Sequence, residues 1–276
     1  MTVRLAQGVG MPKISASAIR LGVVKSMDNV LAMALGAGET TVFRLTGAYS
    51  AFVNGGKKIE PHLIELVQDR EGKVIQHADT RDCPRCSAGF NGDESPRIPV
   101  AGAQVWDPIT AYQITSMLQG VVQRGTAAAA SVLGRPTGGK TGTTSEFRSA
   151  WFVGFTPHLV VGTYIGFDDN RSLGNGETGA QAAVPIFIDF MKEANKSYAP
   201  DDFKPPTNAK FAMVRGIREA FRPGTEPRVA DVGDAVSGPQ PYDKVFQNGL
   251  TGAPNAATAV SPQAPKKPPD DVNGLY

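Results

Sequence analysis

The 276-residue chain has few cysteines, no large excess of charge of either sign and no long apolar run. Its 28 Lys and Arg residues and 26 Asp and Glu residues give a formal net charge of +2. This balance argues against nucleic acid or an anionic membrane surface as a partner. No run of about 18 apolar residues is present, so we expect no membrane-spanning segment in this chain. The opening residues also lack the basic and apolar segments of a signal peptide.

The two cysteines form one C-x-x-C pair, Cys83 and Cys86. A structural zinc site needs four ligands, and His77, the nearest histidine, has no second partner at a suitable spacing. The surrounding polar, Gly-rich and Pro-rich residues differ from the strand-to-helix junction that carries a thioredoxin-type redox site. We therefore expect a local cross-link within a loop or two inert thiols, and neither a metal nor a cofactor. The spacing leaves open whether the two sulfurs bond.

The stretch GRPTGGKTGTT, residues 134–144, satisfies two motifs with unrelated chemistry. Residues 134–141 match G-x-x-x-x-G-K-[ST], the phosphate-binding loop of nucleotide hydrolases. Residues 140–143 read K-T-G-T, part of the signature of serine acyl-transferases that react with penicillin. The surrounding sequence has to decide between the two.

The context of this stretch disfavours a nucleotide site. A phosphate-binding loop follows a parallel strand and opens a helix, whose N-terminus faces the phosphates. Here the alanine run 127–130 favours a helix before the motif. Only residues 142–149 separate the motif from the next apolar strand, whereas a parallel crossover needs roughly a dozen residues or more. Asp168 and Asp169 resemble the acidic end of a magnesium-binding strand, but the spacing after the motif remains too short for a nucleotide site.

The apolar pattern predicts a chain of mixed helices and antiparallel strands. The predicted helices are two short ones within residues 1–22, then 41–54, 108–124 and 184–195. The predicted strand pairs lie on either side of residues 70–73 and at 150–155 with 159–167. Residues 80–99 are predicted to form a polar loop.

The composition shifts beyond Tyr198. The stretch DDFKPPT, residues 201–207, predicts a linker, and a short segment ending at Phe221 is a candidate for ordered structure. The Pro-rich tail cannot bury enough apolar surface to fold, so we expect it to be disordered. The predicted organisation is a principal domain over residues 1–197, an extension over 198–253 and a tail over 254–276.

Longer stretches around K-T-G-T resemble the class A penicillin-binding proteins, the bifunctional peptidoglycan synthases. The similar stretches are LAMALGAGETTVFRLTGAYSAFVNGGKKIEPHLI, PITAYQITSMLQGVVQRGTA, LGRPTGGKTGTT, AWFVGFTPHLVVGTYIGFDDNRSLG and ETGAQAAVPIF. They occur in the family's order and extend to about Ala194. The resemblance implies an α/β (α+β) fold of the β-lactamase and transpeptidase type, with an antiparallel sheet flanked by helices and lacking its N-terminal part.

The resemblance also implies roles for the motif residues. Lys140 would polarise the site, and Thr141 and Thr143 would bind the terminal carboxylate of a D-Ala-D-Ala stem peptide or of a β-lactam. Gly142 and Thr144 would belong to the same substrate-binding stretch, and the Thr143 N–H would form half of an oxyanion hole. The resemblance implies neither a metal nor a cofactor for this acyl transfer.

The sequence departs from the family pattern in three respects. Gly138 stands where relatives usually carry Ala or another small apolar residue, and the loop at residues 145–149 is unusual. In addition, no serine is followed by Lys at the third position, S-x-x-K, or by Asn at the second, S-x-N. Both motifs precede K-T-G in relatives. We therefore expect this chain to be the C-terminal part of a larger enzyme, without its nucleophile, lysine base, glycosyltransferase domain and membrane anchor.

These observations lead to one prediction of function and one alternative. The parent enzyme is predicted to be a D,D-transpeptidase that cross-links peptidoglycan at the periplasmic face of the inner membrane. Since acyl transfer needs an activated serine, we predict no catalytic residue in this chain and no activity of the chain alone. The alternative is a non-catalytic binding fragment. The widely spaced His62, His77 and His158 do not suggest a catalytic set.

Overall fold

The computed structural model describes residues 1–79, 81, 83, 86, 89, 92 and 102–227. The α-helices in this part of the chain are α1 (Thr2–Val9), α2 (Met11–Leu21), α3 (Val42–Val53), α4 (Pro108–Arg124) and α5 (Val184–Ala194). The strands are β1 (Lys57–Lys58), β2 (Leu66–Gln68), β3 (Val74–His77), β4 (Ala103–Gln104), β5 (Gly138–Thr143), β6 (Ser149–Phe155), β7 (Val160–Gly166), β8 (Lys210–Val214) and β9 (Ile217–Phe221). The short 3₁₀-helices are η1 (Leu31–Leu35), η2 (Ala128–Leu133), η3 (Ser145–Phe147) and η5 (Asn195–Ser197), and η4 (Gly179–Ala183) is a π-helix.

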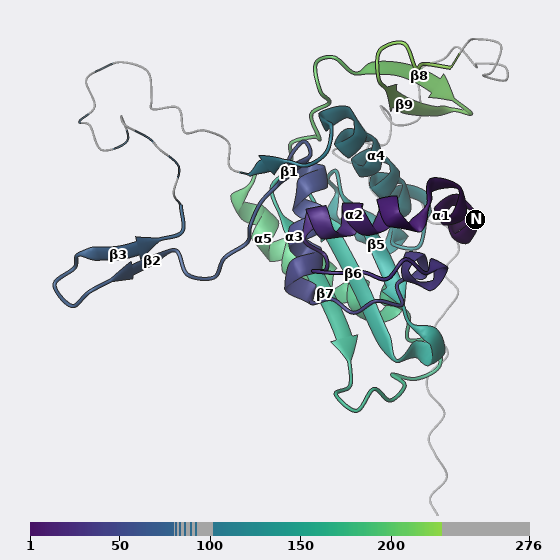
Figure 1. Ribbon diagram of the computed structural model, residues 1–276, viewed down its shortest axis with the longest axis horizontal. Helices are drawn as coiled ribbons and strands as arrows, with labels where there is room; N and C mark the ends of the chain where they lie inside the picture. Colours follow the sequence, from purple (N-terminus) through teal and green to yellow (C-terminus); the bar gives the residue numbers. More distant parts are fainter. Residues whose placement is uncertain are drawn as a thin grey trace, which may run out of the picture. The chain divides into compact units, whose positions relative to one another are not determined.

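The largest sheet has the strand order β5–β6–β7, and both pairings are antiparallel (Figure 1). The tight connection between β6 and β7 is closed by the Thr156 N–H, which donates to the Leu159 carbonyl at 2.9 Å. This hairpin confirms the strand pair predicted at residues 150–167. The short connection leaves no room for a parallel crossover. Strand β5, which carries the motif, also pairs antiparallel with β6.

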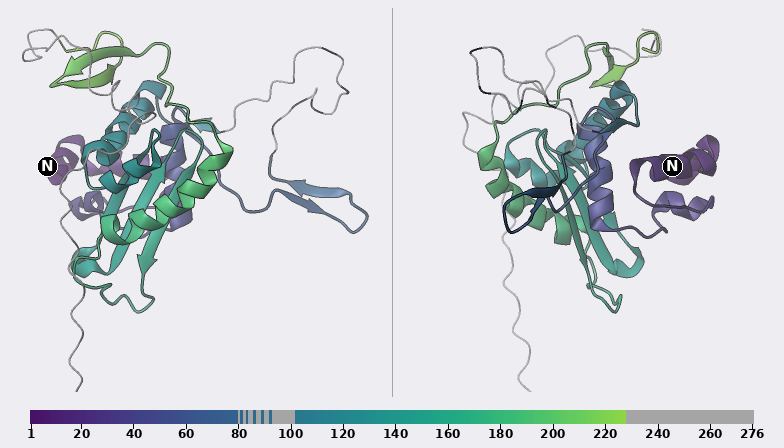
Figure 2. Two further views of the ribbon diagram at one scale, coloured as in Figure 1. Left: turned by 180° about the vertical axis from the view of Figure 1, so that it is seen from behind. Right: turned by 60° about the vertical axis from the view of Figure 1, so that its left-hand side comes forward.

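Helices cover both faces of this sheet (Figure 2). On one face α5 contacts β6 and β7, and the rings of Phe152 and Phe187 meet edge to face with centroids 4.9 Å apart. On the other face α3 contacts β7 and α4 contacts β5. The core on the α5 side buries Phe152, Val184, Phe187 and Met191 completely. The structure thus confirms an antiparallel sheet flanked by helices.

The predicted helix boundaries agree with the observed caps. Asp107 precedes α4, and its carboxylate accepts hydrogen bonds from the N–H groups of Ile109 and Thr110 at 3.0 and 3.1 Å. The hydroxyl of Thr41 caps α3 by accepting from the Arg44 N–H at 3.2 Å. Such caps satisfy N–H groups that have no partner within the helix, so they fix where each helix begins.

The chain beyond α5 is more ordered than its composition suggests. Phe203, within the predicted linker, is buried, and its ring meets Phe155 of β6 at a centroid distance of 5.6 Å. Strands β8 and β9 pair antiparallel, and the side-chain amide of Gln113 in α4 donates to the Ala220 carbonyl at 2.7 Å. The hairpin therefore docks on α4.

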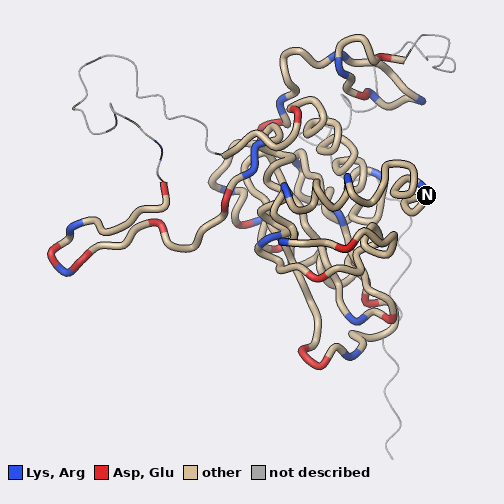
Figure 3. The backbone as a smooth tube through the Cα atoms, viewed as in Figure 1, with Lys and Arg blue, Asp and Glu red and all other residues tan. Residues whose placement is uncertain are grey.

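Two smaller strand pairs form sheets of their own. Strands β2 and β3 form the hairpin predicted around residues 70–73, and β1 pairs with β4. The predicted tail, residues 254–276, lies outside the described residues, as does most of the predicted loop 80–99. Lys and Arg are interspersed with Asp and Glu along the trace (Figure 3). No helix in the described part of the chain has the length and apolar character needed to span a bilayer.

Candidate functional site

The K-T-G-T residues lie on β5, at one edge of the sheet. Residues 138–143 are themselves a strand, and β6 follows antiparallel after one short 3₁₀ turn, η3. A phosphate-binding loop would instead curl around its ligand and open directly into an α-helix. The structure therefore contradicts the nucleotide-binding alternative at the level of backbone geometry.

The backbone of β5 offers hydrogen-bonding groups along its free edge. The Thr144 N–H donates to the Ser149 carbonyl at 3.1 Å, which identifies these two residues as a hydrogen-bonded pair. In an antiparallel ladder such pairs alternate with pairs whose N–H and C=O groups point away from the partner strand. With the observed register, the backbone groups of Thr141 and Thr143 therefore point to the open edge. An extended peptide could pair there as an additional strand.

Lys140 supplies a positive charge at this edge. Its side chain is exposed, and the ammonium donates to the Thr141 carbonyl at 2.9 Å. None of the ion pairs between described residues involves Lys140. The cation is thus held beside the open backbone groups without a carboxylate of the described chain to neutralise it, which favours an anionic ligand.

The threonine hydroxyls of the motif have different neighbours. Thr141 Oγ1 lies 2.8 Å from Thr126 Oγ1, and Thr143 Oγ1 accepts from the Gly179 N–H at 3.0 Å. The Thr144 hydroxyl accepts from the Ser149 N–H at 2.8 Å. The hydroxyls of Thr141 and Thr143 thus have partners from other segments, whereas the Thr144 hydroxyl bonds within the connection between β5 and β6.

Gly142 has close neighbours in the structure. A side chain at this position would meet the Cβ atom of Trp151 at 3.2 Å, and the backbone of Gly179 approaches the Gly142 carbonyl. The resemblance places this glycine in the substrate-binding stretch. The structure adds a packing reason, because Trp151 and η4 both lie against this residue.

The connection between β5 and β6 has an unusual backbone. Glu146 and Phe147 have φ angles of 59° and 54°, in the left-handed region that non-glycine residues rarely adopt. The segment is held by Ser172, whose hydroxyl donates to the Glu146 carbonyl at 2.7 Å, and by the Leu173 N–H, which donates to the Phe147 carbonyl at 2.8 Å. Strained backbone of this kind persists where surrounding contacts fix it, and here it borders the site.

The site is an open strand edge. The two concavities characterised in the described chain lie elsewhere, and neither is lined by a residue of β5. The larger has a volume of about 540 Å³ and is lined by Phe43, residues 60–64, Gln76 and Ala78. A ligand at β5 would therefore bind along the backbone edge and at Lys140, outside both of these concavities.

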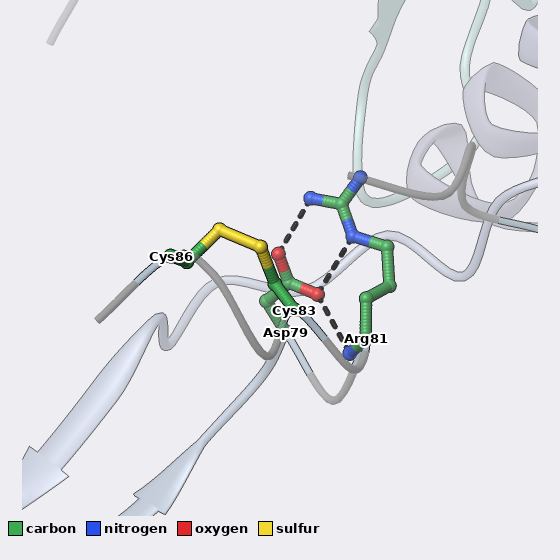
Figure 4. Close-up of a disulfide and its surroundings, with 4 residues drawn as sticks. All are labelled: Asp79, Arg81, Cys83 and Cys86. Atoms are coloured by element: carbon green, nitrogen blue, oxygen red, sulfur yellow. Dashed lines mark hydrogen bonds and ion pairs between the residues drawn. A yellow bond between two sulfur atoms is a disulfide. The ribbon is translucent and has the colours of Figure 1, made fainter. Parts of the chain in front are cut away.

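The cysteines are joined. Cys83 and Cys86 form a disulfide across three positions of the chain (Figure 4), in agreement with a local cross-link. Next to it, Arg81 donates to the Asp79 carboxylate through its side chain at 2.8 Å and through its backbone N–H at 3.0 Å. These hydrogen bonds hold the pKa of Asp79 below its usual range. The disulfide is separate from the β5 residues in sequence.

His62 and His158 each have a separate carboxylate partner. His62 pairs with Glu65 at 3.0 Å, and His158 pairs with Asp201 at 3.0 Å while its ring stacks on Tyr198. These pairs come from different segments, so the described contacts do not bring the histidines together. No grouping of three or more His, Cys, Asp or Glu suited to a metal ion occurs among the residues that the structure describes.

Sequence reasoning missed two contributors to the site. Thr126 lies between α4 and η2, and Gly179 begins η4, so both are distant from the motif along the chain. Both nevertheless contact a motif hydroxyl. The stretches RGTA and ETGAQAA were noted only as parts of a resemblance, and no local pattern in them indicates a contact with β5.

Comparison with known proteins gives a consistent result. The sequence profile of the penicillin binding protein transpeptidase domain matches residues 8–192. Penicillin-binding protein 1A of Rickettsia bellii is 44% identical over 217 residues, which cover 78% of this chain and 27% of that protein. The chain thus spans about a quarter of the length of the curated relatives it matches.

Solved structures show the same relationship. The crystal structure of penicillin-binding protein 1A from Haemophilus influenzae superposes with a TM-score of 0.70 at 31% identity, covering 82% of this chain and 38% of that one. PonA1 of Mycobacterium tuberculosis, solved in complex with penicillin V, superposes with a TM-score of 0.58 at 22% identity over 74% of this chain and 56% of that one, a likeness of fold. The β-lactamase-like fold predicted from the resemblance is confirmed.

Proposed function

Because this chain belongs to the penicillin-binding protein transpeptidase family, we propose that it provides the carboxylate-binding and oxyanion-binding part of a D,D-transpeptidase site. The ligand would be a peptidoglycan stem peptide ending in D-Ala-D-Ala, or a β-lactam. The observation that carries this proposal is the free edge of β5, where the Lys140 ammonium lies beside the outward backbone groups of Thr141 and Thr143.

Each group at this edge has a defined task in the proposal. The Lys140 ammonium attracts the terminal carboxylate of the ligand, and the hydroxyls of Thr141 and Thr143 donate hydrogen bonds to it. The outward N–H of Thr143 donates to the oxygen of the ligand carbonyl, where negative charge develops during acyl transfer. The ligand backbone lies along β5 as an added strand. Together these contacts hold the carbonyl carbon in a fixed place for attack.

The covalent step needs a serine that is activated by a nearby base. In acyl transfer a serine oxygen bonds to the ligand carbonyl carbon, and the bond from that carbon to the leaving amine breaks as the amine gains a proton. No S-x-x-K or S-x-N motif is present among the 276 residues. We therefore propose that this chain alone binds its ligand reversibly and forms no acyl-enzyme. The parent enzyme would act at the periplasmic face of the inner membrane.

Covalent labelling tests whether this chain acylates. The purified 276-residue chain is incubated with a fluorescent penicillin and separated on a denaturing gel. We expect no labelled band, because the serines present lack the neighbouring lysine that would activate them. A saturable covalent label would contradict the proposal and would indicate a nucleophile within the chain.

Reversible binding tests the carboxylate site itself. Benzylpenicillin is titrated into the ¹⁵N-labelled chain, and we expect amide shifts centred on residues 140–143. Lys140→Ala should weaken binding by about tenfold or more, the usual effect of losing a charge-assisted hydrogen bond. Lys192→Ala serves as the matched control, because Lys192 is an exposed lysine on α5. Equal weakening by both variants, or no binding by the unsubstituted chain, would refute a site at Lys140.

A further inference from the structure

Two hydrogen bonds reach the motif hydroxyls from distant segments. Thr126 Oγ1 lies 2.8 Å from Thr141 Oγ1, and the Gly179 N–H donates to Thr143 Oγ1 at 3.0 Å. Thr141 and Thr143 are two residues apart on one strand, so their side chains share a face of β5. The α4–η2 connection precedes the sheet in the sequence, and η4 follows it. Both segments therefore contact the two hydroxyls that are assigned to the ligand carboxylate.

The chemistry of a hydroxyl makes these contacts directional. A hydroxyl has one proton to donate and two lone pairs that accept. The Gly179 amide can only donate, so Thr143 accepts there and keeps its proton for another acceptor. If Thr141 gives its only proton to a ligand carboxylate, its neighbour Thr126 must donate to it. Such a chain of hydrogen bonds polarises each member in the same direction.

From this geometry we infer that Thr126 and the Gly179 N–H are positioning groups that hold Thr141 and Thr143 as donors toward the ligand carboxylate. The inference rests on the proposed function and adds two residues to it. Neither group needs to touch the ligand, because each acts through the hydroxyl of a motif threonine. The two contacts select the rotamer of each threonine and leave its proton directed at the open edge.

The residue type at position 179 follows from the same contact. A Cβ atom there would lie 2.4 Å from the Trp151 carbonyl oxygen and 2.6 Å from that of Gly142. Both are backbone atoms of β6 and β5, so neither can move without distorting the sheet. Glycine is the residue that lets the η4 backbone come close enough for its N–H to reach Thr143. A larger residue would separate η4 from the site.

A substitution at Thr126 tests the first contact. Thr126 is exposed, so Thr126→Val should fold while removing only the hydroxyl, and Thr126→Ser retains it. We expect the dissociation constant of benzylpenicillin to rise about fivefold in Thr126→Val, as for loss of a hydrogen bond between two neutral groups. Thr126→Ser should bind within about twofold of the unsubstituted chain, by the same reasoning.

A ligand without a carboxylate separates positioning from general structure. Benzylpenicillin methyl ester offers no anionic acceptor, so the unsubstituted chain and Thr126→Val should bind it equally. Equal loss of both ligands in Thr126→Val would show a structural role and overturn the inference, as would unchanged binding of benzylpenicillin. Failure of the unsubstituted chain to bind benzylpenicillin would overturn the proposed function, and the positioning role with it.

An NMR signature tests the second contact without altering the backbone. When Thr143 donates to a carboxylate, its oxygen becomes a better acceptor for the Gly179 N–H. We therefore expect the Gly179 amide proton to shift downfield with benzylpenicillin and to remain in place with the methyl ester. A Gly179 amide signal that does not move at saturation with benzylpenicillin would overturn the assignment of Gly179.

Discussion

At the residue scale, the glycines before Lys140 are explained by two aromatic rings. A Cβ atom on Gly138 would lie 2.6 Å from the Phe155 ring, and one on Gly139 would lie 2.6 Å from the Phe152 ring. Gly138 departs from the family pattern, and the position of Phe155 gives that departure a physical reason. Packing of β5 on β6 therefore depends on the absence of side chains just before the site.

Substitution of Gly139 tests this packing. Beyond the ring, its Cβ atom would also approach the Val153 carbonyl oxygen at 2.8 Å, so the strand itself must shift. We expect Gly139→Ala to lower the free energy of unfolding by about 1–3 kcal/mol, measured by urea denaturation. Gly8→Ala is the control, because a Cβ atom there meets nothing within 4 Å and alanine favours the helix. Equal stability of the two variants would contradict the packing argument.

At the scale of elements, the segment after α5 behaves as part of the packed structure. Phe203 is 7% exposed and meets Phe155, which itself lies on β6. We expect Phe203→Ala to lower the free energy of unfolding by about 3–5 kcal/mol, with a smaller loss for Phe203→Leu. The control is Phe43→Ala, since Phe43 is 45% exposed. If Phe203→Ala unfolds like the unsubstituted chain, residues 201–207 are a free linker.

Helix α3 provides a prediction of pH dependence. Burial raises the pKa of the Tyr49 hydroxyl, whose ring also meets Phe52. The unfolded chain then ionises first, near the usual pKa of about 10. The contribution of the protonated Tyr49 hydroxyl to the free energy of unfolding is fully present below that value. It is lost as the pH rises through the folded-state pKa.

The measurement compares urea denaturation at pH 9 and pH 11. Tyr49→Phe cannot ionise, so it should lose less stability over this interval than the unsubstituted chain. Lysine titration acts on both proteins alike and cancels in the comparison. An identical loss in the two proteins would show that the Tyr49 hydroxyl titrates equally in the folded and unfolded states.

At the scale of the whole molecule, the helices and strands that depend on local sequence patterns could be predicted from the sequence. Helices α3, α4 and α5 and the β6–β7 hairpin carry caps, turn residues and apolar periodicity within their own residues, so their existence could be inferred. The spacing after Lys140 also sufficed to prefer an antiparallel strand over a nucleotide site. Family resemblance, not periodicity, supplied the roles of Thr141 and Thr143.

The contacts that could not be predicted join distant residues. Thr126 and Gly179 reach β5 from other segments, and Phe203 leaves a polar, Pro-rich stretch to enter the core. The composition around Phe203 predicts a linker, because the local sequence does not show that the Phe155 ring lies against this residue in the fold. Gly179 could not be interpreted from local sequence either, because the need for a glycine there comes from backbone carbonyls of β5 and β6.

The described chain also leaves many large apolar side chains exposed, and this bears on how it behaves in solution. On α5 the Phe187 ring is fully buried, whereas Ile186 and Phe190 are 50% and 55% exposed. Val3, Leu5 and Val9 of α1 are exposed as well. Contiguous exposed apolar surface promotes association. We therefore predict that the isolated chain self-associates through side chains such as those of α5.

Paired substitutions on α5 separate association from folding. The double variant Ile186→Gln, Phe190→Gln should reduce the concentration-dependent species seen by sedimentation velocity, while the free energy of unfolding changes by less than about 1 kcal/mol. Phe187→Gln, on the same helix, should prevent stable folding because it places an unpaired amide in the core. Unchanged association in the double variant would exclude this face of α5.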